Sequence, residues 1–266
     1  MGVASVNHAF VIPAHGESPY LERCLESLHA QQTTSPVTIA TRAATPGIMA
    51  LARQYGASVR VNNQPQTGIG NDWNFALQCT DAAWVTLAHQ DDVYDPDFST
   101  LVIDAINRHD GAILVTTAYR ELVGDSVRKS SSLMVIKKVL MELGFAGSEL
   151  ARIPFAKQNT LRFGCAIGCP TATINMAKTQ LRFRTDLKNN LDWAAWLVLA
   201  RAQGDFVYLR RPLMSHRIHQ NSETTSGLDS GTRESEDRLL LRSFWPAAIA
   251  DLIASTYGLA YRSNHG

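Results

Sequence analysis

Four carboxylates and a histidine follow directly on one apolar segment of the chain. The segment at 84–88 has the composition of a buried strand, and after it come His89, Asp91, Asp92, Asp95 and Asp97. Carboxylates this close repel one another unless a cation lies between them. Mg²⁺ or Mn²⁺ is the simplest such cation, and it implies a phosphorylated ligand, because these ions bind few carboxylates and take further oxygens from phosphate. The alternative is that Asp91 and Asp92 only cap the next helix.

Other side chains that could take part in binding or catalysis lie in the last third of the chain. His216, Arg217 and His219 lie close together, and the planar guanidinium of an arginine suits phosphate. Two histidines at this spacing are more often structural than ligating, so the spacing alone does not establish a metal site. Asp192 lies near the start of an apolar helical stretch, where the helix dipole alone is a sufficient reason for a carboxylate.

The elements that must position these residues alternate along the first half of the chain. Apolar runs rich in β-branched residues predict strands at 9–13, 37–40, 58–61 and 84–88. Amphipathic stretches between them predict helices at 19–32, 46–55 and 70–79. This alternation indicates βαβ units and a parallel sheet. Ligands bind beyond the carboxyl ends of such strands, so we expect the site in the loops that follow them, at 13–17, 41–47, 64–72 and 89–96.

The second half of the chain is less regular. A helix is expected at 98–109, a strand at 112–117 and a helix at 133–145. Further on we expect an amphipathic helix at 186–203, a strand at 205–209, a polar loop at 220–232 and a helix at 233–258. No repeat and no Pro/Gly/Ser-rich linker divides the chain, which favours one α/β domain.

Composition excludes several classes of partner. The chain has 25 Lys+Arg against 24 Asp+Glu, so it lacks the basic surface that dominates nucleic-acid affinity, and no nucleic-acid partner is expected. No apolar run approaches the roughly 20 residues of a membrane helix, and the N-terminus has no secretory-signal pattern. The 4 cysteines are scattered, as is typical of free thiols in a reducing compartment. We therefore expect a cytoplasmic protein.

Four blocks of the sequence resemble the inverting glycosyltransferases of family 2, which have the GT-A fold. FVIPAHGESPYLERCLESLHAQ is similar to the family's first strand, loop and helix, and TLAHQDDVYDPDF to its metal-binding D-x-D block. GIGNDWNFALQCTDAAWV is similar to the region between them, and LDWAAWLVLARAQGDFVYLRRPLMSHRIHQNSETT to the catalytic helix and the R-x-H segment. The blocks follow the family's order over about residues 8–225. The resemblance implies a mixed, mostly parallel sheet flanked by helices.

The resemblance also implies an activity and its partners. A sugar would pass from a nucleotide-sugar donor to a glycan or lipid-linked glycan acceptor, as in surface polysaccharide synthesis, with Mg²⁺ or Mn²⁺ as cofactor. A lipid-linked acceptor would bring a cytoplasmic enzyme into peripheral contact with the inner face of the membrane. Residues 1–232 would form the GT-A domain, with a nucleotide-binding half (1–117) and an acceptor and catalytic half (118–232), followed by a helical extension (233–266).

Site residues can be carried over one by one. Asp91 matches the second Asp of D-x-D and would bind the metal together with Asp92 and His219, and Asp192 matches the general base. Contacts with the donor are implied for Pro13, Ala14, His15, Glu17, Thr41, Asp72, His89, Gln90, Asp91 and Arg217.

The sequence departs from the family pattern at two places. His89 replaces the first Asp of D-x-D, and the Asp expected after the second strand is missing, where Thr41, Arg42 and Thr45 are the polar groups. Two alternatives therefore stay open. One is a catalytically degenerate GT-A protein that binds or scaffolds. The other is a metal-dependent phosphoester hydrolase built from His89, Asp91, Asp92, His216 and His219. A dinucleotide oxidoreductase is excluded, because G-x-G-x-x-G is absent from the first turn.

Overall fold

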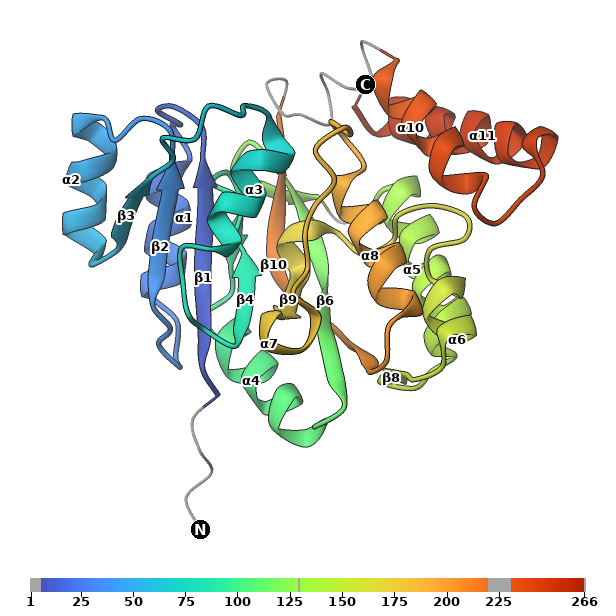
Figure 1. Cartoon of the computed structure of the whole chain (residues 1–266), viewed down its shortest axis with the longest axis horizontal. Helices are drawn as coiled ribbons and strands as arrows, with labels where there is room; N and C mark the ends of the chain where they lie inside the picture. Colours follow the sequence, from blue (N-terminus) through green and yellow to red (C-terminus); the bar gives the residue numbers. More distant parts are fainter. Residues whose placement is uncertain (1–5, 129, 220–230, 266) are drawn as a thin grey trace.

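The fold is an α/β arrangement around one twisted sheet (Figure 1). The computed structural model describes residues 6–128, 130–219 and 231–265. The main path of the sheet has the order β3 (Ser58–Val61), β2 (Val37–Thr41), β1 (His8–Ala14), β4 (Trp84–Leu87), β9 (Ala172–Asn175), β6 (Ala112–Val123), β10 (Asp205–Ile218) and β5 (Val93–Tyr94). Two short strands, β7 (Ser126–Arg128) and β8 (Leu150–Ala151), pair with β6 and β10.

Most strands of this sheet run in the same direction. β3, β2, β1 and β4 pair in parallel, and β6 pairs in parallel with β10. β9 runs antiparallel between β4 and β6, and β5 runs antiparallel at the edge beside β10. The expected mixed, mostly parallel sheet is therefore confirmed.

Helices cover both faces of the sheet. They are α1 (Leu21–His29), α2 (Pro46–Tyr55), α3 (Ile69–Leu77), α4 (Phe98–Arg108), α5 (Ser132–Phe145), α6 (Pro154–Asn159), α7 (Met176–Thr179), α8 (Leu191–Arg201), α10 (Thr232–Leu241) and α11 (Ala247–His265), with a 3₁₀ turn at Cys169–Thr171. α10 and α11 pack together at the end of the molecule that carries α5 and α8 (Figure 1). None of the helices in the described ranges combines the length and the hydropathy that a bilayer-spanning segment needs.

The central strand β1 supplies side chains to two separate cores, because successive residues of a strand point to opposite faces. Phe10 and Ile12 pack with side chains of α1, α2 and α4. Val11 packs on the other face with α3, α5 and α8, where Trp193 and Trp196 are fully buried. Burial on both faces explains why β1 reads as a continuous apolar run in the sequence.

The structure corrects several expected elements. The helix expected at 186–203 is limited to α8, because residues 186–190 form an irregular loop. The strand expected at 205–209 continues to Ile218 as β10. The helix expected at 233–258 is two helices, α10 and α11, separated near Pro246, whose ring nitrogen has no hydrogen to donate. Most of the polar loop expected at 220–232 lies outside the described residues, and α10 already begins at Thr232.

Candidate active site

A cavity of about 750 Å³ lies beyond the carboxyl ends of β1, β2 and β4. This is where a mostly parallel sheet is expected to bind its ligand. Most of the site residues expected from the sequence line it: Pro13, Ala14, His15, Glu17, Thr41, Asp72, His89, Gln90, Asp91, Asp192 and His219. Asp92 and Arg217 do not line the cavity and lie buried behind its wall.

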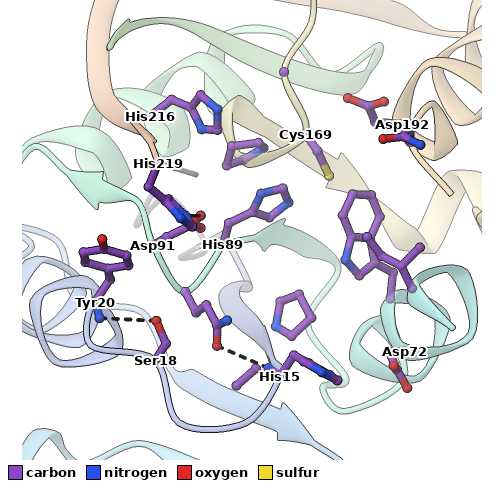
Figure 2. Close-up of a pocket in the computed structure, with 18 of the residues that line it drawn as sticks. His15, Ser18, Tyr20, Asp72, His89, Asp91, Cys169, Asp192, His216 and His219 are labelled. Carbon is purple, nitrogen blue, oxygen red and sulfur yellow. Dashed lines mark hydrogen bonds and ion pairs between the residues drawn. The ribbon is translucent and has the colours of Figure 1, made fainter. Parts of the chain in front are cut away.

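Strand pairing brings the two histidine- and carboxylate-bearing segments together. β5 pairs antiparallel with β10, with Tyr94 opposite Met214 and Val93 opposite Ser215. The residues just before β5 therefore lie beside the end of β10. Figure 2 shows the outcome, with His89 and Asp91 grouped with His216 and His219 at one side of the cavity.

Asp92 is fully buried and held from one side only. Its Oδ1 accepts the backbone N–H of Arg217 at 2.9 Å and Nδ1 of His216 at 3.0 Å. Among the residues that the structure describes, the buried Oδ2 of Asp92 has no hydrogen-bond partner, and neither has the buried Nε2 of His89. His89, Asp91 and Asp92 each offer one potential ligand atom, and these three atoms lie within 4.8 Å of one another. This donor set of one imidazole and two carboxylates fits a divalent ion.

Asp91 is held as an ionised carboxylate. Its Oδ2 accepts Nε2 of His219 at 2.9 Å. Burial by itself would raise the pKa of Asp91, but the hydrogen bond from His219 and the charges of His89 and His216 lower that pKa to about 2. The carboxylate is therefore charged at neutral pH, as a metal ligand must be.

Arg217 supports this corner of the cavity from behind. It is 4% exposed, and its guanidinium donates to the backbone oxygens of Asp91 at 3.0 Å and Gly124 at 2.7 Å. It also lies over the ring of Tyr20, 4.5 Å from the centroid. These contacts fix the backbone of the loop after β4.

Another part of the cavity wall is formed by Arg42, which follows β2, together with Asn62 and Asp72. Nε of Arg42 lies 2.7 Å from Oδ1 of Asp72, which also accepts the amide of Asn62 at 3.0 Å. The other guanidinium nitrogens of Arg42 donate to the backbone oxygens of Gln64 and Gln66. Arg42 therefore organises the part of the cavity where the family pattern has an aspartate.

Asp192 enters the cavity from the first turn of α8, across from Asp91 and His219 (Figure 2). Its Oδ1 accepts the backbone N–H of Trp193 at 2.7 Å, and Sγ of Cys165 lies 3.7 Å from Oδ2. Burial raises the pKa of Asp192, and the positive charges of Arg233 and Lys137 partly oppose that rise. α8 itself is anchored by the indole N–H groups of Trp193 and Trp196, which donate to backbone oxygens at 3.1 Å.

The comparisons with known proteins agree with this geometry. A sequence model described as Glycosyl transferase family 2 matches residues 9–178. The chain belongs to glycosyltransferase family 2. No curated protein matches the sequence.

Solved glycosyltransferases share the fold of this family 2 chain at low sequence identity. TarS of S. aureus, solved with UDP-GlcNAc, is 14% identical with a TM-score of 0.63, and the match covers 97% of this chain and 73% of that one. The mannosyltransferase PcManGT of Pyrobaculum calidifontis, solved with GDP-Man and Mn²⁺, is 12% identical with a TM-score of 0.60, and the match covers 98% and 76%.

Glucosyl-3-phosphoglycerate synthase of Mycobacterium tuberculosis, solved with Mn²⁺, UDP and phosphoglyceric acid, is a third structure with this fold. It is 15% identical with a TM-score of 0.57, and the match covers 90% of this chain and 79% of that one. The fold of the family 2 chain is therefore the expected GT-A fold.

Sequence reasoning missed the contribution of α10 to this glycosyltransferase cavity. The carboxylate of Glu236 accepts the backbone N–H groups of Lys188, Asn189 and Asn190 at 2.7 to 2.9 Å. Asp237 accepts the side-chain amide of Asn190 at 2.7 Å, and burial raises the pKa of Asp237 to about 6. The helical extension is therefore joined to the loop that leads into α8.

Several cavity residues outside the sequence expectation come from distant segments. Tyr20, Trp73, Lys137, Lys188 and Arg233 all line the cavity. Trp73 and Tyr20 lie within the blocks that resemble the family, so their positions could have been inferred there. No local pattern marks Lys137 or Arg233, because their place in the cavity depends on how α5 and α10 pack.

Proposed function

We propose that the chain is an inverting, metal-dependent glycosyltransferase. It moves a sugar from a nucleotide-sugar donor to a hydroxyl group of a glycan or lipid-linked glycan acceptor, in the synthesis of surface polysaccharide. The single observation that carries the proposal is how the side chains are arranged around the cavity. The cluster of His89 and Asp91 lies at one side of it, and the carboxylate of Asp192 faces it from α8.

The donor is proposed to lie along the ends of β1, β2 and β4. Its nucleoside would contact His15, Glu17, Thr41 and Asp72, and its diphosphate would approach Pro13, Ala14, His89, Gln90 and Asp91. Because the guanidinium of Arg217 is bonded to backbone oxygens, we propose that Arg217 holds Asp91 in place rather than contacting the diphosphate.

The ion, Mg²⁺ or Mn²⁺, would be held by Asp91 and Asp92, with His219 in reach because its Nε2 contacts Asp91. When bound, it would stabilise the negative charge of the departing nucleoside diphosphate. Solved enzymes of the same fold that contain Mn²⁺ support this part of the proposal.

Asp192 is proposed as the general base. Its carboxylate takes the proton of the acceptor hydroxyl while that oxygen bonds to the anomeric carbon and the bond from this carbon to the phosphate oxygen breaks. Attack from the face opposite the leaving group inverts the configuration. A raised pKa suits this role, because a base works best when its pKa approaches the working pH.

The proposed acceptor also bears on location and organisation. We propose a cytoplasmic enzyme that meets lipid-linked acceptors at the inner face of the membrane. The exposed apolar side chains on and near α5 and α6, namely Val135, Val139, Ile153 and Phe155, support peripheral contact with the membrane.

We also propose that residues 1–117 form the nucleotide-binding half of the domain, residues 118–232 its acceptor and catalytic half, and residues 233–266 a helical extension. Because the carboxylate of Glu236 accepts the backbone N–H of Asn190, we propose that the extension stabilises the catalytic half.

A donor screen tests the proposal. Nucleotides and sugar nucleotides are added with Mn²⁺ and the melting temperature is followed, since a donor at 100 times its Kd stabilises by about 2.7 kcal/mol. Release of nucleoside diphosphate from the best ligand is then measured. A folded sample that releases none from any sugar nucleotide would favour the scaffold alternative, and metal-dependent cleavage of a phosphoester without a sugar nucleotide would favour the hydrolase.

A further inference from the structure

We infer that His89 binds the metal ion directly through Nε2, and that this nitrogen gives the centre a preference for Mn²⁺ over Mg²⁺. The inference deepens the proposed function, since it concerns the ion that the donor diphosphate would share. The inference rests on the position of His89, the residue that departs from the family's D-x-D pattern.

Two buried atoms at this place have no hydrogen-bond partner within the described part of the chain. They are Nε2 of His89 and Oδ2 of Asp92, whose side chain is 0% exposed. A buried polar atom without a partner costs free energy, and a folded protein rarely keeps one without a reason. The two residues belong, with Asp91, to one group whose potential ligand atoms lie within 4.8 Å of one another. One bound cation would satisfy both atoms together.

Neighbouring groups hold both side chains in place. The imidazole of His89 packs against the indole of Trp73, with ring centroids 5.2 Å apart. The backbone oxygen of His89 accepts Sγ of Cys24 at 3.3 Å and the backbone N–H of Asp92 at 3.2 Å. Because Arg217 and His216 occupy Oδ1 of Asp92, its Oδ2 is left for the ion. The ligands are therefore oriented before the ion arrives, as groups around metal ligands usually ensure.

The ligand types decide which ion fits. Mg²⁺ prefers an octahedral shell of oxygens, whereas imidazole favours transition ions, whose affinity rises from Mn²⁺ through Co²⁺. A histidine in place of an aspartate removes one negative charge from this group and offers a nitrogen where the aspartate would offer an oxygen. We therefore expect Mn²⁺ and Co²⁺ to bind on the order of tenfold or more tightly than Mg²⁺.

The test measures metal binding on the full chain, with Mn²⁺ alone and with Mn²⁺ plus inorganic pyrophosphate, which stands in for the donor's diphosphate. Pulsed EPR of the bound Mn²⁺ reports nitrogen ligands, and competition titration gives the ratio of Kd values for Mg²⁺ and Mn²⁺. We expect His89→Asn to remove one nitrogen coupling and His89→Asp to bring the two Kd values close together. His219→Asn identifies any coupling from the second histidine.

The matched control is His109→Asn, because His109 pairs with Glu149 at 3.2 Å and does not line the cavity. It should leave both readouts unchanged. The inference is overturned if both His89 variants keep the nitrogen couplings and the Kd ratio of the original chain, or if no ion binds under either condition. The proposed function fails in a different way, by an absence of nucleoside diphosphate release while metal binding is intact.

Discussion

The carboxylate of Glu236 accepts the backbone N–H of Asn190 at 2.9 Å and so joins α10 to the residue that precedes α8. The same carboxylate accepts the N–H groups of Lys188 and Asn189. N–H groups at the start of a helix have no partner inside the helix, so an external acceptor fixes how the helix begins. Asp192 lies in the first turn of α8. α10 therefore positions the proposed base from a distant part of the chain.

We expect Glu236→Gln to lower the rate of transfer while donor binding is preserved. The amide keeps one acceptor oxygen but loses the charge, and hydrogen bonds to a charged group contribute about 1.5–3 kcal/mol each. The loop at 188–190 would loosen and Asp192 would shift. The measurement compares kcat, the KM for the donor and the unfolding midpoint.

Glu234→Gln is the matched control, because Glu234 lies on the same helix and pairs with Arg238 at 2.6 Å. Its kcat should equal that of the original chain. A fall in stability with an unchanged kcat in Glu236→Gln would show that the contact holds the fold without positioning the base.

The role of Glu236 marks the limit of what the sequence could predict. The elements β1 to β4 and α1 to α3 follow from apolar periodicity, and so does the placement of the acidic cluster at the end of β4. β9, a short strand placed between β4 and β6, has no such signal, since its partners are far away in the chain. Contacts of buried polar groups between distant elements leave no local pattern.

β10 illustrates a different failure. The apolar run that predicts a strand at 205–209 is followed by Arg210 and Arg211 and by Pro212, which cannot donate a hydrogen bond to a neighbouring strand. The strand continues because its pairing with β6 shifts register between Leu209 and Pro212. That irregularity lets β10 reach the cavity with His216 and place Arg217 behind the cavity wall, which local propensity could not reveal.

Asp192→Asn should abolish transfer and leave donor binding nearly unchanged. Asparagine keeps the size of the side chain but cannot take a proton, and general base catalysis contributes about 10²–10⁴-fold in rate. In the original chain the base works only when ionised. Since its pKa is raised, kcat should begin to fall on acidification above the ordinary carboxyl value of about 3.9.

The measurement is kcat against pH, together with the donor Kd from titration. The acid limb should disappear in any residual activity of Asp192→Asn. Asp186→Asn is the control, since Asp186 is exposed and pairs with Arg184. Near-normal transfer by Asp192→Asn would contradict the assignment of the base.

Folding stability should fall on acidification because of His8. The side chain is 3% exposed between Ser35 and Thr86, and burial lowers the pKa of His8 to about 3. Between the ordinary value of 6.5 and about 3, the unfolded chain binds a proton that the folded chain does not. Stability from this group is therefore complete above pH 6.5 and is lost as the pH falls, by at most about 1.4 kcal/mol per pH unit.

Urea unfolding of the original chain and of His8→Asn between pH 7 and 4.5 isolates this contribution. The difference in unfolding free energy between the two should shrink toward acid pH, because asparagine does not titrate. His29→Asn, which changes an exposed histidine, should keep the pH dependence of the original chain. An equal slope in the original chain and His8→Asn would rule out His8 as the source.

Gly144 permits the close contact between α5 and α6. A Cβ at this position would collide with the backbone oxygen of Ala156 and the methyl group of Thr160. Alanine favours a helix over glycine by about 1 kcal/mol, but overpacking against backbone costs about 1–3 kcal/mol or more. We therefore expect Gly144→Ala to destabilise the protein on balance.

Gly258, in α11, provides the opposite case, because a Cβ there meets no atom of the described residues within 4 Å. Gly258→Ala should raise the unfolding free energy by up to about 1 kcal/mol, as helix propensity is the only change. Thermal unfolding of the two variants side by side gives the comparison. If Gly144→Ala raised the unfolding free energy as much as Gly258→Ala, the backbone of α6 would have to move away from the new Cβ at no free-energy cost. The close packing of α5 on α6 would then not require glycine at position 144.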